Sequence, residues 1–346
     1  MFRPLDRQDT KQCKEVLSIK KLEARDCSWS TCQTMLKWIV DSVNMTVTLP
    51  PYCVARLKEI IVSISCTQHR VGVDKWHRVL GKLCSMALAL PGAKGFFSQM
   101  QEDLCHVKGK RVTLSTGVHE ALSDFKWLAE DVANRPTRMY ELVPLRPTVD
   151  GYHNSSGYMC RGVVLPGPTS IPRKFPPQPS DTRLSPNTNG AHPIVLHVPF
   201  PKDIVDSLVS WTNPQGTVNN SELELAGGVV HSDFVAQCFV VTERTKLLRT
   251  NNTAGLWWQL KGSATCTSAP AHLLQLQAMH QRFFHYVPRI DFVSGVDNLI
   301  SDLPSRSSDL TDNQLLAYLE THFPQPLTWQ LWTPPPKFAS VIASAL

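Results

Sequence analysis

The chain has 346 residues, of which 42% are hydrophobic and 18% are charged. This length allows two or three domains, and this composition excludes a chain that is disordered throughout. No apolar run approaches the roughly 20 residues of a membrane span, so we expect no membrane partner. The N-terminal residues lack the apolar core of a signal peptide, and the ten cysteines include no Cys-x-x-Cys. We therefore expect free thiols in an intracellular protein.

The formal charge of +6 lies entirely in the first part of the chain. Residues 1–150 hold 22 Lys and Arg against 16 Asp and Glu, and the remainder holds 13 of each. An excess of positive charge favours a polyanionic partner such as nucleic acid. A surplus of this size also occurs in proteins that bind no polyanion, so it indicates this partner only weakly.

Residues 1–143 are predicted to be mainly helical. Residues 29–43 have an amphipathic or strand-like pattern, and residues 45–49 alternate until Pro50 and Pro51 end them. Beyond these prolines, apolar residues recur at helical spacing. The predicted helices span residues 52–64, 73–90, 93–107 and 115–133.

From residue 144 onward, strand patterns alternate with helical ones. Residues 149–165 predict two strands joined by a tight turn that contains glycine, and a proline-rich loop follows over 166–193. Strands or extended segments are then predicted at 194–200, 237–241, 245–250 and 290–293. Helices are predicted at 203–211, from 221 onward, and at 253–260, 269–286 and 298–305. This order predicts an α/β layer fold over 144–308.

Residues 309–346 are predicted to form a C-terminal tail. A helical pattern covers residues 310–319, and prolines interrupt the segment that follows. We expect Trp329 and Trp332 in this segment to cover an edge of the α/β domain.

The helix predicted from Ser221 carries a candidate functional carboxylate. Ser221 and Glu224 match a Ser-x-x-Glu capping box, and Leu225, Val229 and Phe234 give the helix an apolar face. Two interpretations of Glu224 are open at this point. It is either a capping carboxylate, or a metal ligand at the start of a helix that packs on a sheet.

Four short motifs occur in the order in which retroelement ribonuclease H domains carry them. The first motif is His-Asn-Ser-Ser-Gly at 153–157 with Arg-Gly-Val-Val at 161–164, and the second is Glu-Leu-Ala-Gly at 224–227. The third is Asn-Asn-Thr-Ala at 251–254 with Lys-Gly-Ser-Ala-Thr at 261–265. The fourth is Val-Ser-Gly at 293–295 with the segment at 298–306. Upstream, residues 76–81, 89–93 and 97–100 resemble the thumb that follows a reverse transcriptase palm. The palm motif Tyr-x-Asp-Asp is absent.

The chain therefore resembles the C-terminal piece of a retrotransposon reverse transcriptase/ribonuclease H polyprotein. The resemblance implies a thumb or connection region over 1–143 and a ribonuclease H-like mixed sheet, flanked by helices, over 144–308. It also implies an RNA–DNA hybrid or other nucleic acid as partner, with remaining polyprotein segments as further candidate partners.

The same resemblance implies hydrolysis of the RNA strand by two Mg²⁺ ions held by four carboxylates. Their positions fall on Asn154, Glu224, Asn251 and Asp302 here, so two of the four are neutral amides. Because Mg²⁺ is a hard cation that is usually bound through carboxylates, we expect weak or absent Mg²⁺ binding and impaired catalysis. Asp150, about 13 Å before Asn154 on a strand, and Glu222 are carboxylates that could substitute.

Each of these features also has a simpler structural interpretation. Asp302 could be a solvated carboxylate at a helix start. Trp257 and Trp258 could stack on bases, but paired tryptophans more often lie in a core. Lys108 to Arg111 could contact a phosphate backbone or form a plain basic turn.

Three functions remain open for the whole chain: an impaired nuclease, a non-catalytic nucleic-acid-binding module, or a reading frame with no selected role. The sequence has no P-loop, dinucleotide fingerprint or serine-hydrolase elbow to support another enzyme class.

Overall fold

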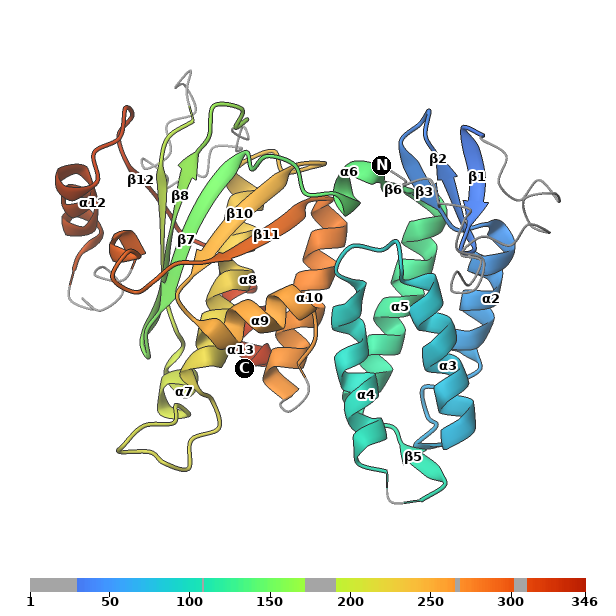
Figure 1. Cartoon of the computed structure of the whole chain (residues 1–346). Helices are drawn as coiled ribbons and strands as arrows, with labels where there is room; N and C mark the ends of the chain where they lie inside the picture. Colours follow the sequence, from blue (N-terminus) through green and yellow to red (C-terminus); the bar gives the residue numbers. More distant parts are fainter. Residues whose placement is uncertain (1–29, 108, 172–190, 265–267, 302–309) are drawn as a thin grey trace, which may run out of the picture.

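The computed structural model describes residues 30–107, 109–171, 191–264, 268–301 and 310–346 (Figure 1). A mainly helical region up to Leu142 precedes a six-stranded mixed sheet flanked by helices. This arrangement confirms the predicted fold class. None of the helices in these ranges is long and apolar enough to cross a bilayer.

The helical region contains the helices that the apolar spacing predicts. They are α2 (Pro51–Val62), α3 (Val73–Met86), η1 (Ala93–Phe96), α4 (Phe97–Cys105), α5 (Thr116–Asn134) and the short α6 (Met139–Leu142). The predicted third helix is divided, because η1 is a 3-10 turn ahead of α4. Two small antiparallel sheets accompany these helices: β1 (Cys32–Met35), β2 (Trp38–Asp41), β3 (Thr46–Thr48) and β6 (Thr137–Arg138) form one, and β4 (Arg70–Gly72) and β5 (Arg111–Thr113) form the other.

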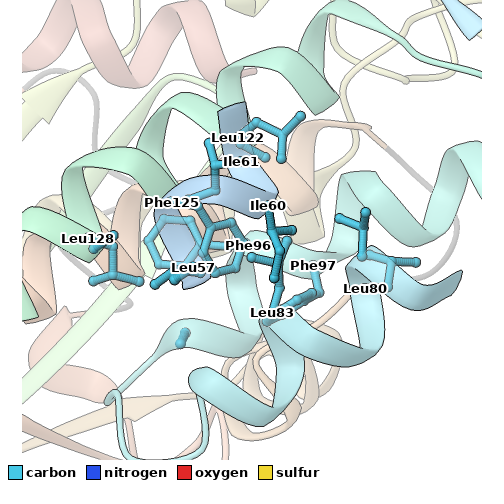
Figure 2. Close-up of a cluster of buried hydrophobic side chains, with 14 of the residues drawn as sticks. Leu57, Ile60, Ile61, Leu80, Leu83, Phe96, Phe97, Leu122, Phe125 and Leu128 are labelled. Atoms are coloured by element: carbon cyan, nitrogen blue, oxygen red, sulfur yellow. The ribbon is translucent and has the colours of Figure 1, made fainter. Parts of the chain in front are cut away.

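The core of the helical region is apolar and lies between α2, α3, α4 and α5 (Figure 2). Phe125 of α5 packs against Phe96 and Phe97, with ring centroids 5.4 and 5.1 Å apart. Leu57 and Leu83 contribute fully buried side chains from α2 and α3. The apolar spacing read from the sequence is thus the face that each helix buries.

The six-stranded sheet has the order β11-β10-β7-β8-β9-β12. Strands β7, β8 and β9 form an antiparallel meander, β10 and β11 add in parallel on the β7 side, and β12 pairs in parallel with β9. Their bounds are β7 Val149–Ser155, β8 Met159–Pro166, β9 Ile194–Pro199, β10 Thr245–Thr250, β11 Val287–Phe292 and β12 Gln330–Trp332. Most of the predicted 166–193 loop lies outside the described residues.

Helices cover both faces of this sheet (Figure 1). One face packs against α8 (Asn220–Cys238), α10 (Ser268–Phe284) and α13 (Pro336–Ala345), with α9 (Thr253–Lys261) beside them. The other face packs against α12 (Asp312–His322). Helix α8 continues to Cys238, so the prediction of an extended segment from Gln237 was wrong at its first two residues. These two residues stay helical because α8 packs on the apolar core beneath the sheet as far as Cys238, and this packing outweighs their preference for an extended backbone.

Glycines let α8 lie close to the sheet. A Cβ atom at Gly151 or Gly162 would lie 2.3 or 2.6 Å from the His231 ring, and one at Gly227 would lie 2.3 Å from Ser155 Oγ. These distances leave no room for a side chain. Adjacent glycines in a helix normally cost stability, so their presence here follows from the close approach of helix and sheet.

The C-terminal tail packs on the sheet. Strand β12 extends the β9 edge, and the Trp332 ring packs against Phe234 of α8 with ring centroids 5.1 Å apart. Trp329 is buried on the opposite face, together with Leu315 of α12. The two tryptophans therefore cover the edge from both sides, as the sequence predicts.

Helix α10 joins the two regions. Its Ala278 belongs to the apolar core of the helical region, whereas its Leu273 belongs to the core beneath the sheet. Arg282, with 1% of its side chain exposed, places Nε 2.6 Å from Asp131 Oδ2 and Nη1 3.0 Å from Thr137 Oγ1. The buried guanidinium of Arg282, on a helix that packs beneath the sheet, is thus bound by side chains of the helical region.

Candidate functional site

Four segments that carry the sequence motifs meet at one end of the sheet. The parallel strands β7 and β10 end there, beside the start of α8. Asn252, just after β10, donates from Nδ2 to Ser221 Oγ in α8 at 3.3 Å. Asn298 donates from Nδ2 to the His153 carbonyl of β7 at 3.2 Å. The carboxyl ends of neighbouring parallel strands are a frequent place for ligand sites in α/β folds.

The start of α8 differs from the prediction. The N-cap is Asn219, whose Oδ1 accepts from Glu222 N at 3.1 Å, while Glu222 Oε2 accepts from Asn219 N at 2.9 Å. The capping box is therefore Asn219 with Glu222, and not Ser221 with Glu224. This pairing removes capping as the role of Glu224, and it keeps Glu222 engaged at the cap.

Glu224 is buried against β7, with 3% of its side chain exposed, and its Oε2 lies 3.7 Å from His153 Nδ1. Burial, with a smaller effect of Lys246, lowers the pKa of His153 to about 3. The imidazole is therefore neutral at pH 7, and this contact is not a salt bridge. Burial also raises the pKa of the neighbouring Cys160 thiol to about 12, despite a hydrogen bond to Ser155.

Asn154 follows His153 and faces the opposite side of β7, because successive strand residues alternate. In the antiparallel register of β7 and β8, Asn154 lies opposite Arg161. Burial lowers the pKa of Arg161 to about 10, so the guanidinium remains charged, and its Nη2 lies 3.4 Å from His197 Nε2. His197 Nδ1 in turn lies 3.3 Å from Asp312 Oδ1 of α12.

Asn251 lies immediately after β10, at the same end of the sheet. A Cβ atom at Gly295 would lie 3.8 Å from Asn251 Nδ2, so this side chain faces the segment before Asn298. The next residue, Asn252, caps α9 by accepting from Gly255 N at 2.7 Å. Asp302, the fourth predicted position, lies outside the described residues.

Asp150 lies at the other end of β7, about 13 Å before Asn154. Its Oδ2 forms an ion pair with Arg249 Nη2 at 3.1 Å. Burial raises the pKa of Asp150, Arg249 opposes this shift, and Asp291 adds to it. The structure thus keeps Asp150 with Arg249 and apart from the segments that meet near Glu224.

The described residues do not fit a two-magnesium centre. Asn154 and Asn251 offer neutral amide oxygens, and Glu224 lies beside a neutral imidazole, whereas Mg²⁺ is bound mainly through carboxylate oxygens. Within the described ranges, no group of three or more His, Cys, Asp or Glu side chains is placed to hold a metal ion. These residues therefore support no catalytic step through Mg²⁺.

Sequence reasoning missed His153 as the partner of Glu224, although it named His153 within the motif. The two-residue period of β7 was the available signal, because it places His153 and Ser155 on one face and Asn154 on the other. The Asn252–Ser221 contact was not predictable from spacing, because it depends on how α8 and β10 lie in the sheet.

No family model and no curated protein matches this sequence. Among solved structures, a foamy viral protease-reverse transcriptase in complex with an RNA/DNA hybrid matches with 8% identity and a TM-score of 0.27, over 82% of this chain and 31% of that one. The foamy viral protease-reverse transcriptase dRH in complex with double-stranded DNA matches with 8% identity and a TM-score of 0.26, over 76% and 38%. The chain thus spans only about a third of the length of these two proteins, and TM-scores this low carry no argument about function.

Proposed function

We propose that this chain is a nucleic-acid-binding, ribonuclease H-like part of a retroelement polyprotein whose hydrolytic site is impaired. The observation that carries the proposal is the meeting of the β7 end, the β10 end, the α8 start and the 294–301 segment at one end of the sheet. Those are the segments on which the resemblance places the site. Asn154 and Asn251 stand where that resemblance implies carboxylates, which is the reason for proposing impairment.

A basic face on the helical region supports nucleic acid as the partner. Lys75, Arg78 and Lys82 are exposed on α3, and their spacing places them on one side of the helix. None of the three forms an ion pair with a carboxylate within the described ranges. A phosphate backbone would supply the missing negative charge and release counterions on binding.

Binding of a labelled RNA–DNA hybrid, measured by fluorescence anisotropy at several salt concentrations without divalent metal, tests this function. We expect the affinity to fall steeply with salt, and replacing the three α3 side chains by Gln to reduce the log–log slope by about 3. Binding that does not depend on salt, or no binding by the folded chain, would contradict the proposal.

Hybrid cleavage with Mg²⁺ and then Mn²⁺ tests the impairment. The unaltered chain is expected to cleave very slowly or not at all. The Asn154→Asp/Asn251→Asp variant is expected to cleave faster by orders of magnitude, because two formal negative charges return to the site. Lys37→Gln/Lys58→Gln changes the net charge by the same two units on the helical region and serves as control. If restoration leaves cleavage unchanged in a folded protein, the assignment of Asn154 and Asn251 is wrong.

A further inference from the structure

Helix α9 carries an exposed stripe that runs from the candidate site toward the helical region. Thr253, Trp257, Leu260 and Lys261 are exposed, and their spacing places them on one side of the helix. Trp257 has 56% of its surface exposed, whereas the adjacent Trp258 is partly buried and packs on the core beneath the sheet. The tryptophan pair is therefore divided, with one ring in the core and one in solvent.

The two ends of α9 lie against different parts of the molecule. Its N-cap, Asn252, contacts Ser221 at the start of α8, within the candidate site. Its C-terminal end lies beside η1 of the helical region, because a Cβ atom at Gly262 would be 3.2 Å from Lys94 Cβ. The nine residues of α9 span about 13 Å, which corresponds to about four base-pair steps of a duplex.

Two lysines flank the point where α9 reaches the helical region, since Lys261 precedes Gly262, which lies against Lys94. Lys94 and Lys261 are both exposed, and neither forms an ion pair with a carboxylate within the described ranges. Lys261 Nζ lies 5.8 Å from the centre of the Trp257 ring, which places a cation and an aromatic face side by side. Like charges placed together without a counter-charge are stabilised by a bound polyanion.

We propose that Thr253, Trp257, Lys261 and Lys94 form a path for one nucleic-acid strand, from the candidate site to the helical region. Lys94 and Lys261 neutralise backbone phosphates, and the Trp257 ring packs on an exposed base or sugar. A cation pair with an adjacent aromatic face fits a nucleic-acid strand, which presents phosphates and flat bases in regular alternation. This inference rests on the proposed function and adds where the strand runs.

The test measures binding of a labelled RNA–DNA hybrid with a single-stranded overhang over a range of salt concentrations. Trp257→Ala is expected to weaken binding about 5- to 100-fold at every salt concentration, because base stacking is largely independent of salt. Trp257→Phe, which keeps an aromatic ring, is expected to retain most of the affinity. Lys94→Gln/Lys261→Gln is expected to lower the log–log salt slope by about 2.

Matched variants separate this path from a general loss of aromatic surface or charge. Trp211→Ala removes a fully exposed tryptophan from the loop before α8, and Lys37→Gln/Lys58→Gln removes two exposed lysines from the helical region. Both are expected to change affinity less than twofold at moderate salt. Circular dichroism confirms folding of each variant.

The outcomes distinguish the two proposals. If the unaltered chain shows no salt-dependent binding, the proposed function fails and this path fails with it. If the unaltered chain binds, and the α9 and Lys94 variants bind as tightly as it does, only the path is overturned. A loss in Trp211→Ala equal to that in Trp257→Ala would also overturn it.

Discussion

The helical region and the face of the sheet beneath α8 bury different kinds of side chain. The core between α2, α3, α4 and α5 is apolar, and its buried Trp76 indole donates to the Met100 carbonyl at 3.2 Å. The buried Asp131 and Glu141 of the helical region lie at its boundary with α10, near Arg282. Beneath α8, Lys246 Nζ instead donates to Ser232 Oγ, with 2% of the lysine exposed. His280 bridges Asp233 Oδ1 at 3.2 Å and the Tyr286 hydroxyl at 3.1 Å.

This difference indicates how each region should respond to perturbation. Apolar burial is non-directional and does not depend on protonation, so the helical region should be sensitive to lost volume and insensitive to pH between 6 and 8. A buried polar network depends on which groups carry protons, so the α8 face should respond to pH. Arg282 lies between the two regions and belongs to neither kind of core.

The largest effect is expected at the joint between the regions. Arg282→Ala leaves Asp131 with only part of its charge compensation, because Arg135 is its remaining ion-pair partner. Removing one member of a buried pair typically costs about 3–5 kcal/mol, and we expect a loss in that range in urea unfolding. The two regions should then unfold in separate transitions, as monitored by tryptophan fluorescence and circular dichroism.

Arg289→Ala is the matched control for this prediction. Arg289 Nη2 lies 3.2 Å from Asp291 Oδ2, but both side chains are exposed, at 51% and 38%. Such pairs contribute about 0–1 kcal/mol. Equal losses for Arg282→Ala and Arg289→Ala would show that Arg282 does not hold the regions together.

A cavity in the helical core is expected to have the next largest effect. Leu57, 1% exposed, packs in the cluster shown in Figure 2. Leu57→Ala should lower the free energy of unfolding by about 3 kcal/mol through lost apolar contact and the cavity that remains. The loss should be the same at pH 6 and pH 8. A loss that differs between these pH values would show that the stability of the helical core also depends on protonation.

The sequence predicts much of this architecture, because periodicity reports burial directly. The helices over 52–64 and 115–133 and the β7–β8 hairpin follow from apolar spacing and turn residues. Strands β4, β5 and β12 are three residues each, too short for alternation to identify, and they exist through pairing with distant segments. Propensity alone carries no information on such long-range pairs.

The candidate site is predicted less completely. Motif order places Asn154, Glu224 and Asn251 on segments that meet in the fold, but the capping box is two residues earlier than predicted. Both Ser221 and Asn219 have capping side chains, and the sequence alone does not decide between them. Tertiary packing selects Asn219 as the cap, because a helix that starts at Asn220 turns Glu224 toward His153.

Lys246 makes the pH dependence of the α8 face testable. Burial lowers its pKa to about 7, and Asp233 opposes this shift. In the unfolded chain a lysine keeps its proton up to about pH 10.4, so unfolding takes up a proton between these values. Stability should therefore rise by about 1 kcal/mol from pH 7 to pH 8. Above pH 8 the buried thiols of Cys160 and Cys238, whose pKa values are raised by burial, oppose this rise.

Lys246→Met checks the source of that slope. Methionine fills a similar volume and carries no titratable group, and Asp233 keeps the His280 contact. Urea unfolding at pH 7, 7.5 and 8 should then give a much flatter profile than the unaltered chain. If the slope is retained in Lys246→Met, other groups produce it and the contrast between the two cores is weaker than proposed.

The smallest effect is expected at the β1–β2 hairpin of the helical region. Its two-residue turn holds Leu36 at φ 49° and Lys37 at φ 69°, which is the left-handed region that side chains disfavour. Leu36→Asn/Lys37→Gly should raise the free energy of unfolding by about 1 kcal/mol.

Lys37→Ala should give no comparable gain, since alanine keeps the steric cost of positive φ. A gain in Lys37→Ala as large as that of the Asn-Gly pair would mean that side-chain loss, and not backbone relief, stabilises the hairpin. Because the strain is in the backbone and involves no titrating group, the gain should be independent of pH, as expected for this region.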